Sequence, residues 1–408
     1  MAASWTLTAR WIFPADREPL PGGTVTISGD RIVAVEPHGR RQADEDLGDA
    51  ALLPGLVNAH THLDLTGLRG LTPPTPDFTA WLRMVVGHRR TVTPDQVRLA
   101  TEAGLAECLR YGTTLLGDIA HQGQSWQILA KAPIRAVVFH ELLGLTADRA
   151  RRAWEDLEEW LPWRANTDTC RAGLSLHAPY SVHRSLFQKA AAMIRQTKPS
   201  YPLAVHLAET PAELELLERR SGPFVDFLTE MGTWDPEGLA ASPQEVMDYF
   251  QGISQVLWIH ANYLQPRTKF GTGDTIVYCP RTHAAFGHPP HPFREFLSRG
   301  IRVALGTDSL ASNPDLDVLA EVRFLHRNYP DVPGATLLCM ATLSGAEALG
   351  WHNETGSLTP GKSADLVVLP LPDKKVTDAH QLVFDSDLPV KRVMFRGEWI
   401  QNPASRER

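Results

Sequence analysis

Between residues 51 and 305, short apolar runs alternate with longer helical patterns, and this alternation constrains the fold most. Helical periodicity covers 93–111, 148–160, 185–196 and 211–218. The apolar runs have the composition of buried strands and lie at 51–57, 113–119, 134–139, 172–176, 202–205, 255–259, 275–278 and 301–305. Eight such strands predict an α/β fold, a (β/α)₈ TIM-type barrel. A doubly wound sheet is the alternative, but no Gly-x-Gly-x-x-Gly follows an early strand.

Both ends of the chain are rich in strand patterns. The N-terminal part has runs at 5–13, 24–28 and 31–35, and the C-terminal part has runs at 364–370, 390–396 and 398–401. Because chain termini often lie close together, these runs are expected to pair. The predicted organisation is a small β-sandwich built from residues 1–53 and 356–408, and a barrel over 54–355.

Polar residues follow five of the apolar runs. Carboxyl ends of barrel strands meet at one rim, where the active sites of this fold form. One histidine at a strand end is usually a satisfied core or rim residue, but five such ends together indicate a site. The residues concerned are His60 and His62 after the first run, His177 after the fourth, His206 after the fifth, His260 after the sixth and Asp308 after the eighth.

The sequence His60-Thr61-His62 is suited to binding a metal. Residues i and i+2 of a strand lie on one face, so both imidazoles can reach one point. His206 and Asp308 can complete the ligand set, because the first and eighth strands are neighbours in a closed barrel. Three histidines and one aspartate leave a position open for water, as in catalytic zinc or iron sites.

Two motifs carry a resemblance to a known family. The sequence LPGLVNAHTHL spans 53–63, and GSLTPGKSADLV spans 356–367. Together with the strand-end residues, they resemble the amidohydrolase superfamily, in its cytosine/adenosine-deaminase-like branch. This branch includes aminodeoxyfutalosine, thioadenosine and adenosylhomocysteine deaminases and chlorohydrolases.

The resemblance implies roles for individual residues. His60, His62, His206 and Asp308 would bind one divalent metal per chain, zinc with iron as the alternative. His260 would hydrogen-bond the reacting water, Asp308 would also accept its proton, and Glu209 would shuttle protons. Two-metal relatives have a carboxylated lysine on the fourth strand. Residues 171–180 contain no lysine, which favours a mononuclear site.

The predicted function is hydrolytic deamination of an aminated heterocycle. A carboxylic acid such as Glu209 can protonate a ring nitrogen and then the leaving amine. An adenine-type nucleoside such as aminodeoxyfutalosine is the leading substrate. The alternatives are a triazine chlorohydrolase, a guanine- or cytosine-type hydrolase, and a non-catalytic barrel scaffold.

Five residues are candidates for substrate contact: His177, Trp81, Arg281, His283 and Ser309. Trp81 could stack on a heterocycle or pack within its loop. Arg281 could bind a carboxylate or pair with a neighbouring residue. His283 stands where related deaminases keep an asparagine.

Two further features of these loops bear on the substrate. His283, His288 and His291 form a cluster expected to shape the loop or touch substrate rather than bind a second metal. Thioadenosine and adenosylhomocysteine deaminases carry a glutamate for ribose hydroxyls shortly after the position of Trp81. No acidic residue lies between Trp81 and Thr93, so this compact segment is more similar to aminodeoxyfutalosine deaminases.

Composition narrows the possible partners and location. The net charge of −7 argues against nucleic-acid binding, and no apolar run reaches the roughly 18 residues of a membrane span. The N-terminus lacks a signal-peptide pattern, and the four cysteines are scattered, so a cytoplasmic protein with reduced thiols is expected. Pairing through outer helices makes a homodimer the default expectation.

Overall fold

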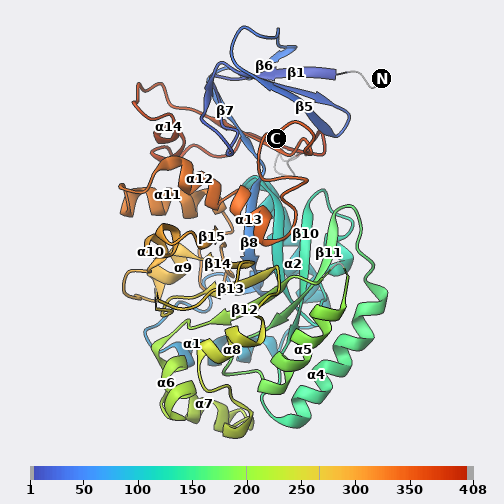
Figure 1. The fold of residues 1–408 in the computed structure, drawn as a ribbon, viewed down its shortest axis with the longest axis vertical. Helices are drawn as coiled ribbons and strands as arrows, with labels where there is room; N and C mark the ends of the chain where they lie inside the picture. Colours follow the sequence, from blue (N-terminus) through green and yellow to red (C-terminus); the bar gives the residue numbers. More distant parts are fainter. Residues whose placement is uncertain (1–3, 199, 266, 402–408) are drawn as a thin grey trace.

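The computed structural model describes residues 4–198, 200–265 and 267–401, and its largest element is an eight-stranded parallel sheet (Figure 1). Its strands follow one another in sequence order from β8 to β15. They are β8 (Leu56–Thr61), β9 (Thr113–His121), β10 (Arg135–Leu142), β11 (Cys170–Leu176), β12 (Leu203–Leu207), β13 (Val256–His260), β14 (Asp274–Tyr278) and β15 (Arg302–Leu305). The predicted (β/α)₈ barrel is therefore confirmed.

The barrel closes between its first and last strands. The backbone N–H groups of Thr307 and Asp308 both donate to the carbonyl oxygen of His60, each at 3.1 Å. Nearby, the Asn58 amide donates to Thr307 Oγ1 at 2.7 Å and accepts from the Thr307 N–H at 3.1 Å. Asp308 is thereby fixed beside the His-x-His segment, as expected from the sequence.

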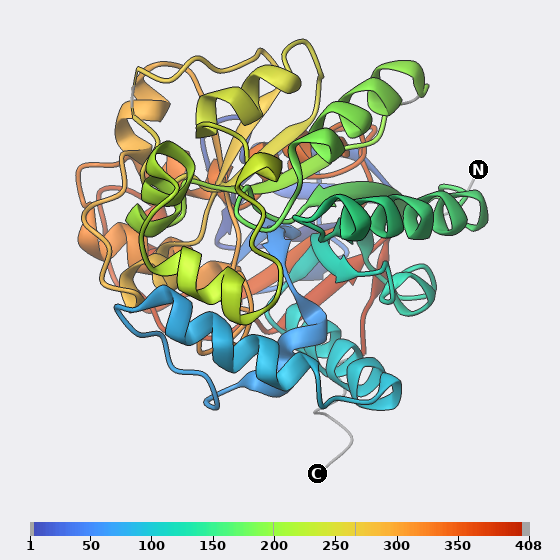
Figure 2. The same ribbon diagram turned by 90° about the horizontal axis from the view of Figure 1, so that it is seen from below.

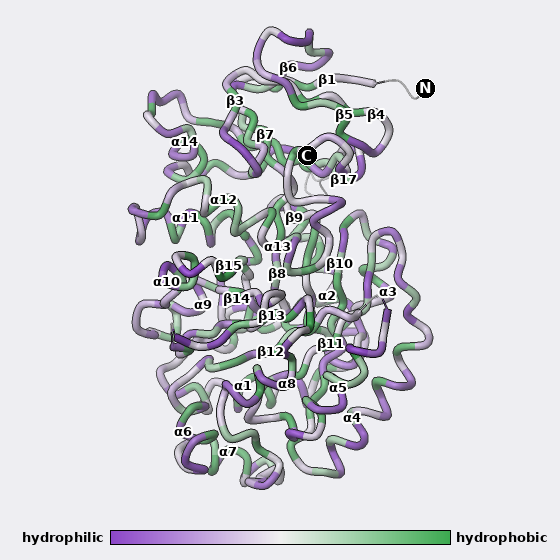
Figure 3. Tube along the Cα trace, viewed as in Figure 1, coloured by the Kyte–Doolittle hydropathy of each residue, from purple (hydrophilic) through white to green (hydrophobic). Residues whose placement is uncertain are grey.

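Helices surround the sheet, and hydropathy along the chain follows this layering, with apolar strands inside and mixed helices outside (Figure 3). Several begin at side-chain caps, such as α2, where Thr93 and Gln96 form a capping box. The surrounding helices are α2 (Pro94–Arg110), α3 (Trp126–Leu129), α4 (Ala147–Trp160), α5 (Arg184–Gln196), α6 (Pro211–Arg219), α8 (Pro243–Tyr249), α9 (Pro280–Ala285), α10 (Phe293–Ser298), α11 (Val318–Asn328), α12 (Gly334–Met340) and α13 (Leu343–Ala348).

Strands from the two ends of the chain gather at the opposite end of the barrel from α1 (Phe78–Arg89) and α7 (Pro223–Glu230) (Figure 1). One sheet has the order β5-β4-β1-β6, and a second has the order β18-β17-β16-β7-β2-β3. Their bounds are β1 (Ser4–Thr8), β2 (Trp11–Ile12), β3 (Leu20–Pro21), β4 (Thr24–Ser28), β5 (Arg31–Glu36), β6 (Glu45–Asp46), β7 (Ala50–Pro54), β16 (Leu366–Pro370), β17 (Arg392–Phe395) and β18 (Glu398–Trp399).

The two terminal sheets share one apolar core, which includes Leu7, Val25, Leu52, Leu366 and Met394. This packing agrees with a small sandwich made from both ends. The predicted boundaries at residues 53 and 356 stay a prediction, and residues 1–3 and 402–408 of that unit lie outside the described residues.

The prediction of one strand over 51–57 is wrong. The run is divided between β7, which pairs with β16 of the terminal sheet, and β8, which pairs with β9 of the barrel. Gly55 separates them, and a Cβ added there would lie 1.9 Å from Thr114 Oγ1. Buried strands of two adjoining sheets have the same apolar composition, so periodicity alone does not separate them.

A second apolar cluster lies over the carboxyl ends of the barrel strands. It combines residues of the segment Leu63–Leu68, of α1 and of α7, which cross this end of the barrel in Figure 2. Phe78 and Trp81 from α1 pack with Phe286 at ring-centroid distances of 5.4 and 5.1 Å. These elements form the cover of the candidate site.

Two predictions, on membrane-spanning segments and on the state of the cysteines, can be compared with the described residues. None of their helices combines the length and the apolar character needed to cross a membrane. All four cysteines are unpaired, and Cys108, Cys170 and Cys279 are buried whereas Cys339 is half-buried.

Candidate metal centre and active site

Histidine side chains from three different strands meet at the carboxyl rim of the barrel. The Nε2 atoms of His62 and His206 lie 3.3 Å apart, and the ring centroids of His60 and His206 are separated by 4.9 Å. Asp308 Oδ1 lies 3.5 Å from His60 Nε2 and 3.7 Å from His62 Nε2. The four residues predicted as ligands are therefore together. The donor atoms of His60, His62 and His206 form one group compact enough for one ion, and those of His60, His260 and Asp308 form a second.

Burial favours the neutral form of the His62 and His206 imidazoles, the form that binds a metal. It lowers the pKa of His62 to about 3, with the charge of His60 adding to the effect, and it also holds the pKa of His206 well below its ordinary value. Both ring nitrogens of His60 are buried, and no described residue forms a hydrogen bond with them. Nitrogen lone pairs facing one another in a buried site fit a cation between them.

A hydrogen bond behind His206 sets its orientation. Its Nδ1–H donates to the carbonyl oxygen of His177 at 2.7 Å, which leaves Nε2 with the lone pair. Asp308 is held in the same way, because Ser312 Oγ donates to its Oδ2 at 2.8 Å. The remaining oxygen, Oδ1, faces the histidines.

Glu209 lies next to this set of ligands. Its Oε1 is 3.4 Å from His260 Nε2, and its side chain is 7% exposed. Burial raises the pKa of Glu209 well above its ordinary value, and the charges of Asp308 and Glu213 act in the same direction. These effects favour the protonated form of Glu209, which is the form that can donate a proton.

The loop that carries Glu209 is held by Glu213, a residue that the sequence analysis did not select. The backbone N–H groups of Ala208 and Glu209 donate to the two carboxylate oxygens of Glu213 at 2.9 and 3.0 Å. Thr210 caps α6 by accepting from the Glu213 N–H. The sequence signal for this arrangement was the spacing Thr210-x-x-Glu213, typical of a capping box.

Four residues at the strand ends adopt left-handed backbone conformations. The φ angles are 51° at Ala208, 64° at His260, 56° at Ala261 and 57° at Asp308. Such conformations are costly for residues other than glycine and concentrate at functional sites. Here they turn the chain sharply beside the candidate ligands.

Three of the five predicted substrate contacts line the pocket beside the metal centre. These are His177, Trp81 and Ser309. The Trp81 indole is 7% exposed, and its Nε1–H is 3.2 Å from the carbonyl oxygens of Thr72 and Ala311. His177 Nδ1 lies 2.6 Å from Ser181 Oγ. Whether these three residues touch substrate stays a prediction.

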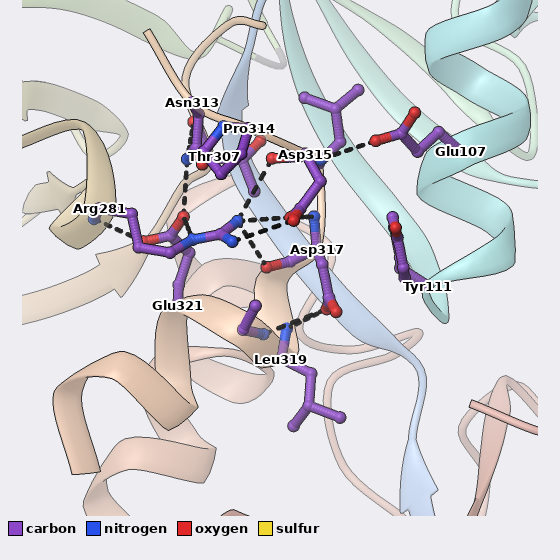
Figure 4. Close-up of polar contacts among 12 residues, drawn as sticks. Glu107, Tyr111, Arg281, Thr307, Asn313, Pro314, Asp315, Asp317, Leu319 and Glu321 are labelled. Carbon is purple, nitrogen blue, oxygen red and sulfur yellow. Dashed lines mark hydrogen bonds and ion pairs between the residues drawn. The ribbon is translucent and has the colours of Figure 1, made fainter. Parts of the chain in front are cut away.

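Arg281 is not among the residues lining this pocket, and it is engaged elsewhere (Figure 4). Its Nε–H donates to Glu321 at 2.7 Å, and its Nη2 donates to Asp315 at 2.6 Å. Both partners are acidic residues of the protein itself. Of the two roles expected for Arg281, the geometry therefore favours holding the loop and not binding a substrate carboxylate.

His283 is also outside the set of pocket-lining residues. Its ring centroid lies 5.3 Å from that of His288 and 5.7 Å from that of His291. His291 Nε2–H donates to the carbonyl oxygen of His260 at 2.8 Å. Among the described residues this cluster does not form a compact group of metal donors, so its visible role is to shape the rim beside His260.

The structure adds a charged wall that the sequence analysis missed. Glu141, at the end of β10, and Arg89, at the end of α1, both line the pocket. Their side chains form an ion pair at 3.2 Å. The available signal was a glutamate two residues beyond the apolar run at 134–139. The pattern underestimated the length of β10, which continues to Leu142.

Comparison with known proteins agrees with this geometry. The sequence model of the amidohydrolase family matches residues 51–400. The chain belongs to the amidohydrolase family. As a family member with relatives named deaminases, it is a hydrolase that acts on carbon–nitrogen bonds.

Three similar proteins illustrate the relationship. A 5-methylthioadenosine/S-adenosylhomocysteine deaminase of Nitratidesulfovibrio vulgaris is 30% identical over 368 residues, covering 86% of this chain and 78% of the relative. An aminodeoxyfutalosine deaminase of Nitratiruptor is 27% identical over 380 residues, covering 90% and 91%. The zinc-bound crystal structure of an adenosine deaminase from Xanthomonas campestris has a TM-score of 0.79 and 26% identity, covering 97% and 92%.

Proposed function

We propose that this amidohydrolase is a zinc-dependent deaminase of adenine-type nucleosides, with aminodeoxyfutalosine as the leading substrate. The observation that carries the proposal is the position of Glu209, a buried carboxylic acid 3.4 Å from His260 and beside the four candidate ligands. Deamination needs such an acid, because ammonia is a far better leaving group than an amide anion.

The candidate ligands fit a single divalent metal. His60, His62, His206 and Asp308 supply three neutral nitrogens and a carboxylate oxygen, the donor set of a catalytic zinc or iron site. A metal held there would lower the pKa of a water molecule to about 7. β11 contains no lysine, which supports one metal and not a lysine-bridged pair.

The remaining steps belong to the protein's own residues. Glu209 donates its proton to a ring nitrogen, which makes the adjacent carbon open to attack by water. Asp308 takes up the proton that the water loses, and His260 holds the water by a hydrogen bond. The deprotonated Glu209 then takes up the remaining proton of the added hydroxyl group and gives it to the departing amine, which leaves as ammonia. The proton held by Asp308 returns to Glu209 and restores the acid.

The pocket supports a planar heterocycle. Leu65, Phe78, Trp81, Leu82 and Val85 form one apolar wall next to the polar rim. A flat ring between apolar side chains and a few polar groups is the usual arrangement of small-molecule sites. The deaminase names of the similar proteins support an adenine nucleoside over a triazine as the ligand.

Replacing Glu209 tests the proton shuttle. We expect Glu209→Gln to retain the metal and to lose activity on the order of 100-fold or more, because the amide cannot cycle a proton. Steady-state ammonia release and elemental analysis would be measured on the same samples. Glu218→Gln, an exposed change on α6, is the matched control. Unchanged turnover in Glu209→Gln would assign the shuttle to another group.

A further inference from the structure

The charged wall of the pocket is built around Glu141. This residue is the last but one of β10 and lines the pocket together with His62 and His177. Its side chain is only 1% exposed. The backbone fixes its place, since the next residue, Leu142, accepts a hydrogen bond from the His177 N–H at 3.2 Å.

The two oxygens of Glu141 have different surroundings. Oε2 accepts a hydrogen bond from Arg89 Nη1 at 3.2 Å, and His121 Nδ1 lies 3.8 Å away from it. Oε1 is equally buried, but no group among the described residues donates to it. Buried carboxylate oxygens are rarely left without a donor, so Oε1 is an acceptor suited to a bound molecule.

The charges around Glu141 determine which kind of hydrogen-bond donor on a bound molecule can approach it. Arg89 is shared with Asp64, whose Oδ2 lies 3.2 Å from Arg89 Nη2. Two carboxylates therefore surround one guanidinium, and Oδ1 of Asp64 also lacks a donor among the described residues. This wall repels a carboxylate or phosphate and favours neutral hydrogen-bond donors such as hydroxyl groups.

We propose that Glu141, oriented by Arg89, recognises the sugar hydroxyl groups of a nucleoside substrate, with a substrate O–H donating to Oε1. The inference rests on the proposed function, since the heterocycle must face Glu209 for the sugar to reach this wall. Glu141 is then a specificity residue, and Arg89 is a positioning residue that acts through it. An anionic substituent of the substrate must be directed away from this wall.

Substrate analogues test the hydroxyl contact in the unaltered enzyme. Ammonia release would be compared for adenosine and 2′,3′-dideoxyadenosine. We expect kcat/KM to fall on the order of 10- to 100-fold when the hydroxyls are absent, the usual effect of losing a hydrogen bond to a charged group. Equal kcat/KM for the two nucleosides would overturn the inference.

A variant assigns the effect to Glu141. Glu141→Leu should lower kcat/KM for adenosine on the order of 10- to 100-fold. It should leave kcat/KM for 2′,3′-dideoxyadenosine almost unchanged. Asp156→Asn, an exposed acidic change on α4 beside the adjoining cavity, should alter neither substrate. An equal loss on both substrates in Glu141→Leu would show a structural role and overturn the assignment. If Glu141→Leu does not fold, Glu141→Gln is compared in the same way.

Calorimetry separates this inference from the proposed function. Binding of inosine and 2′,3′-dideoxyinosine to the wild-type protein requires no turnover. Tighter binding of inosine without ammonia release from any nucleoside would sustain the hydroxyl contact and reject deamination. Ammonia release together with equal binding of the two nucleosides would support deamination and reject the hydroxyl contact.

Discussion

Two buried carboxyl groups at the site have opposite proton affinities. Burial acts on both and favours the neutral form. At Glu209 the neighbouring charges are also negative, so its pKa is raised. At Asp308 the effect of burial is outweighed by the nearby imidazoles of His60 and His260, so its pKa is lowered. One residue can therefore donate a proton while the other accepts one.

The pKa of Glu213 gives a prediction about stability. Burial raises this pKa from 4.5 to about 7. Between these values the folded state holds more protons than the unfolded state, so the free energy of unfolding falls as pH rises, until about pH 7. Relative to Glu213→Gln, the wild type should lose about 2–3 kcal/mol between pH 5 and pH 8.

Denaturant unfolding of both proteins at the two pH values measures this difference. Glu218→Gln, which changes an exposed residue of the same helix, should show no pH-dependent difference from the wild type. A stability difference that stays constant with pH, or that shifts in favour of the wild type as pH rises, would contradict the prediction.

At the residue scale, sequence reasoning selected the candidate ligands that the fold brings together, but it did not select the charged residues of the pocket wall. Histidines at strand ends are unusual enough to be noticed, and barrel topology places them together. Glu141 and Arg89 are ordinary residues of a strand and a helix. Their pairing depends on how α1 crosses the rim, which no local pattern encodes.

At the scale of elements, the barrel strands were predictable because each is a short apolar run between helical patterns. Their carboxyl ends were underestimated, since β10 and β12 continue through the polar residues that form the site. Hydrogen bonding to neighbouring strands extends them. The division of 51–57 between two sheets likewise depends on tertiary pairing and on the close approach of Gly55 to Thr114.

At the scale of the whole molecule, a buried ion pair links the barrel to the C-terminal strands. Arg135 on β10 binds Asp365, and their side chains are 3% and 0% exposed. The Arg135 guanidinium also lies 5.0 Å from the ring centroid of Phe395 on β17. We expect this contact to couple the stability of the terminal sheets to that of the barrel.

Removing one partner of this pair should be costly. We expect Arg135→Ala to lower the free energy of unfolding by about 3–5 kcal/mol, because Asp365 would remain buried without its cation. In a double-mutant cycle, the combined change Arg135→Ala and Asp365→Ala should cost clearly less than the sum of the single changes. Additive losses in denaturant unfolding would show that the two residues act independently.

The most direct test of the account is ammonia release measured together with metal content. The panel would hold aminodeoxyfutalosine, adenosine, methylthioadenosine, adenosylhomocysteine, guanine, cytosine and an aminotriazine, with His206→Ala as the variant that lacks one ligand. We expect the wild type to hold about one metal ion per chain and to release ammonia from an adenine nucleoside. His206→Ala should lose both the metal and the ammonia release. A metal-loaded wild type that releases ammonia from none of these compounds would contradict the account.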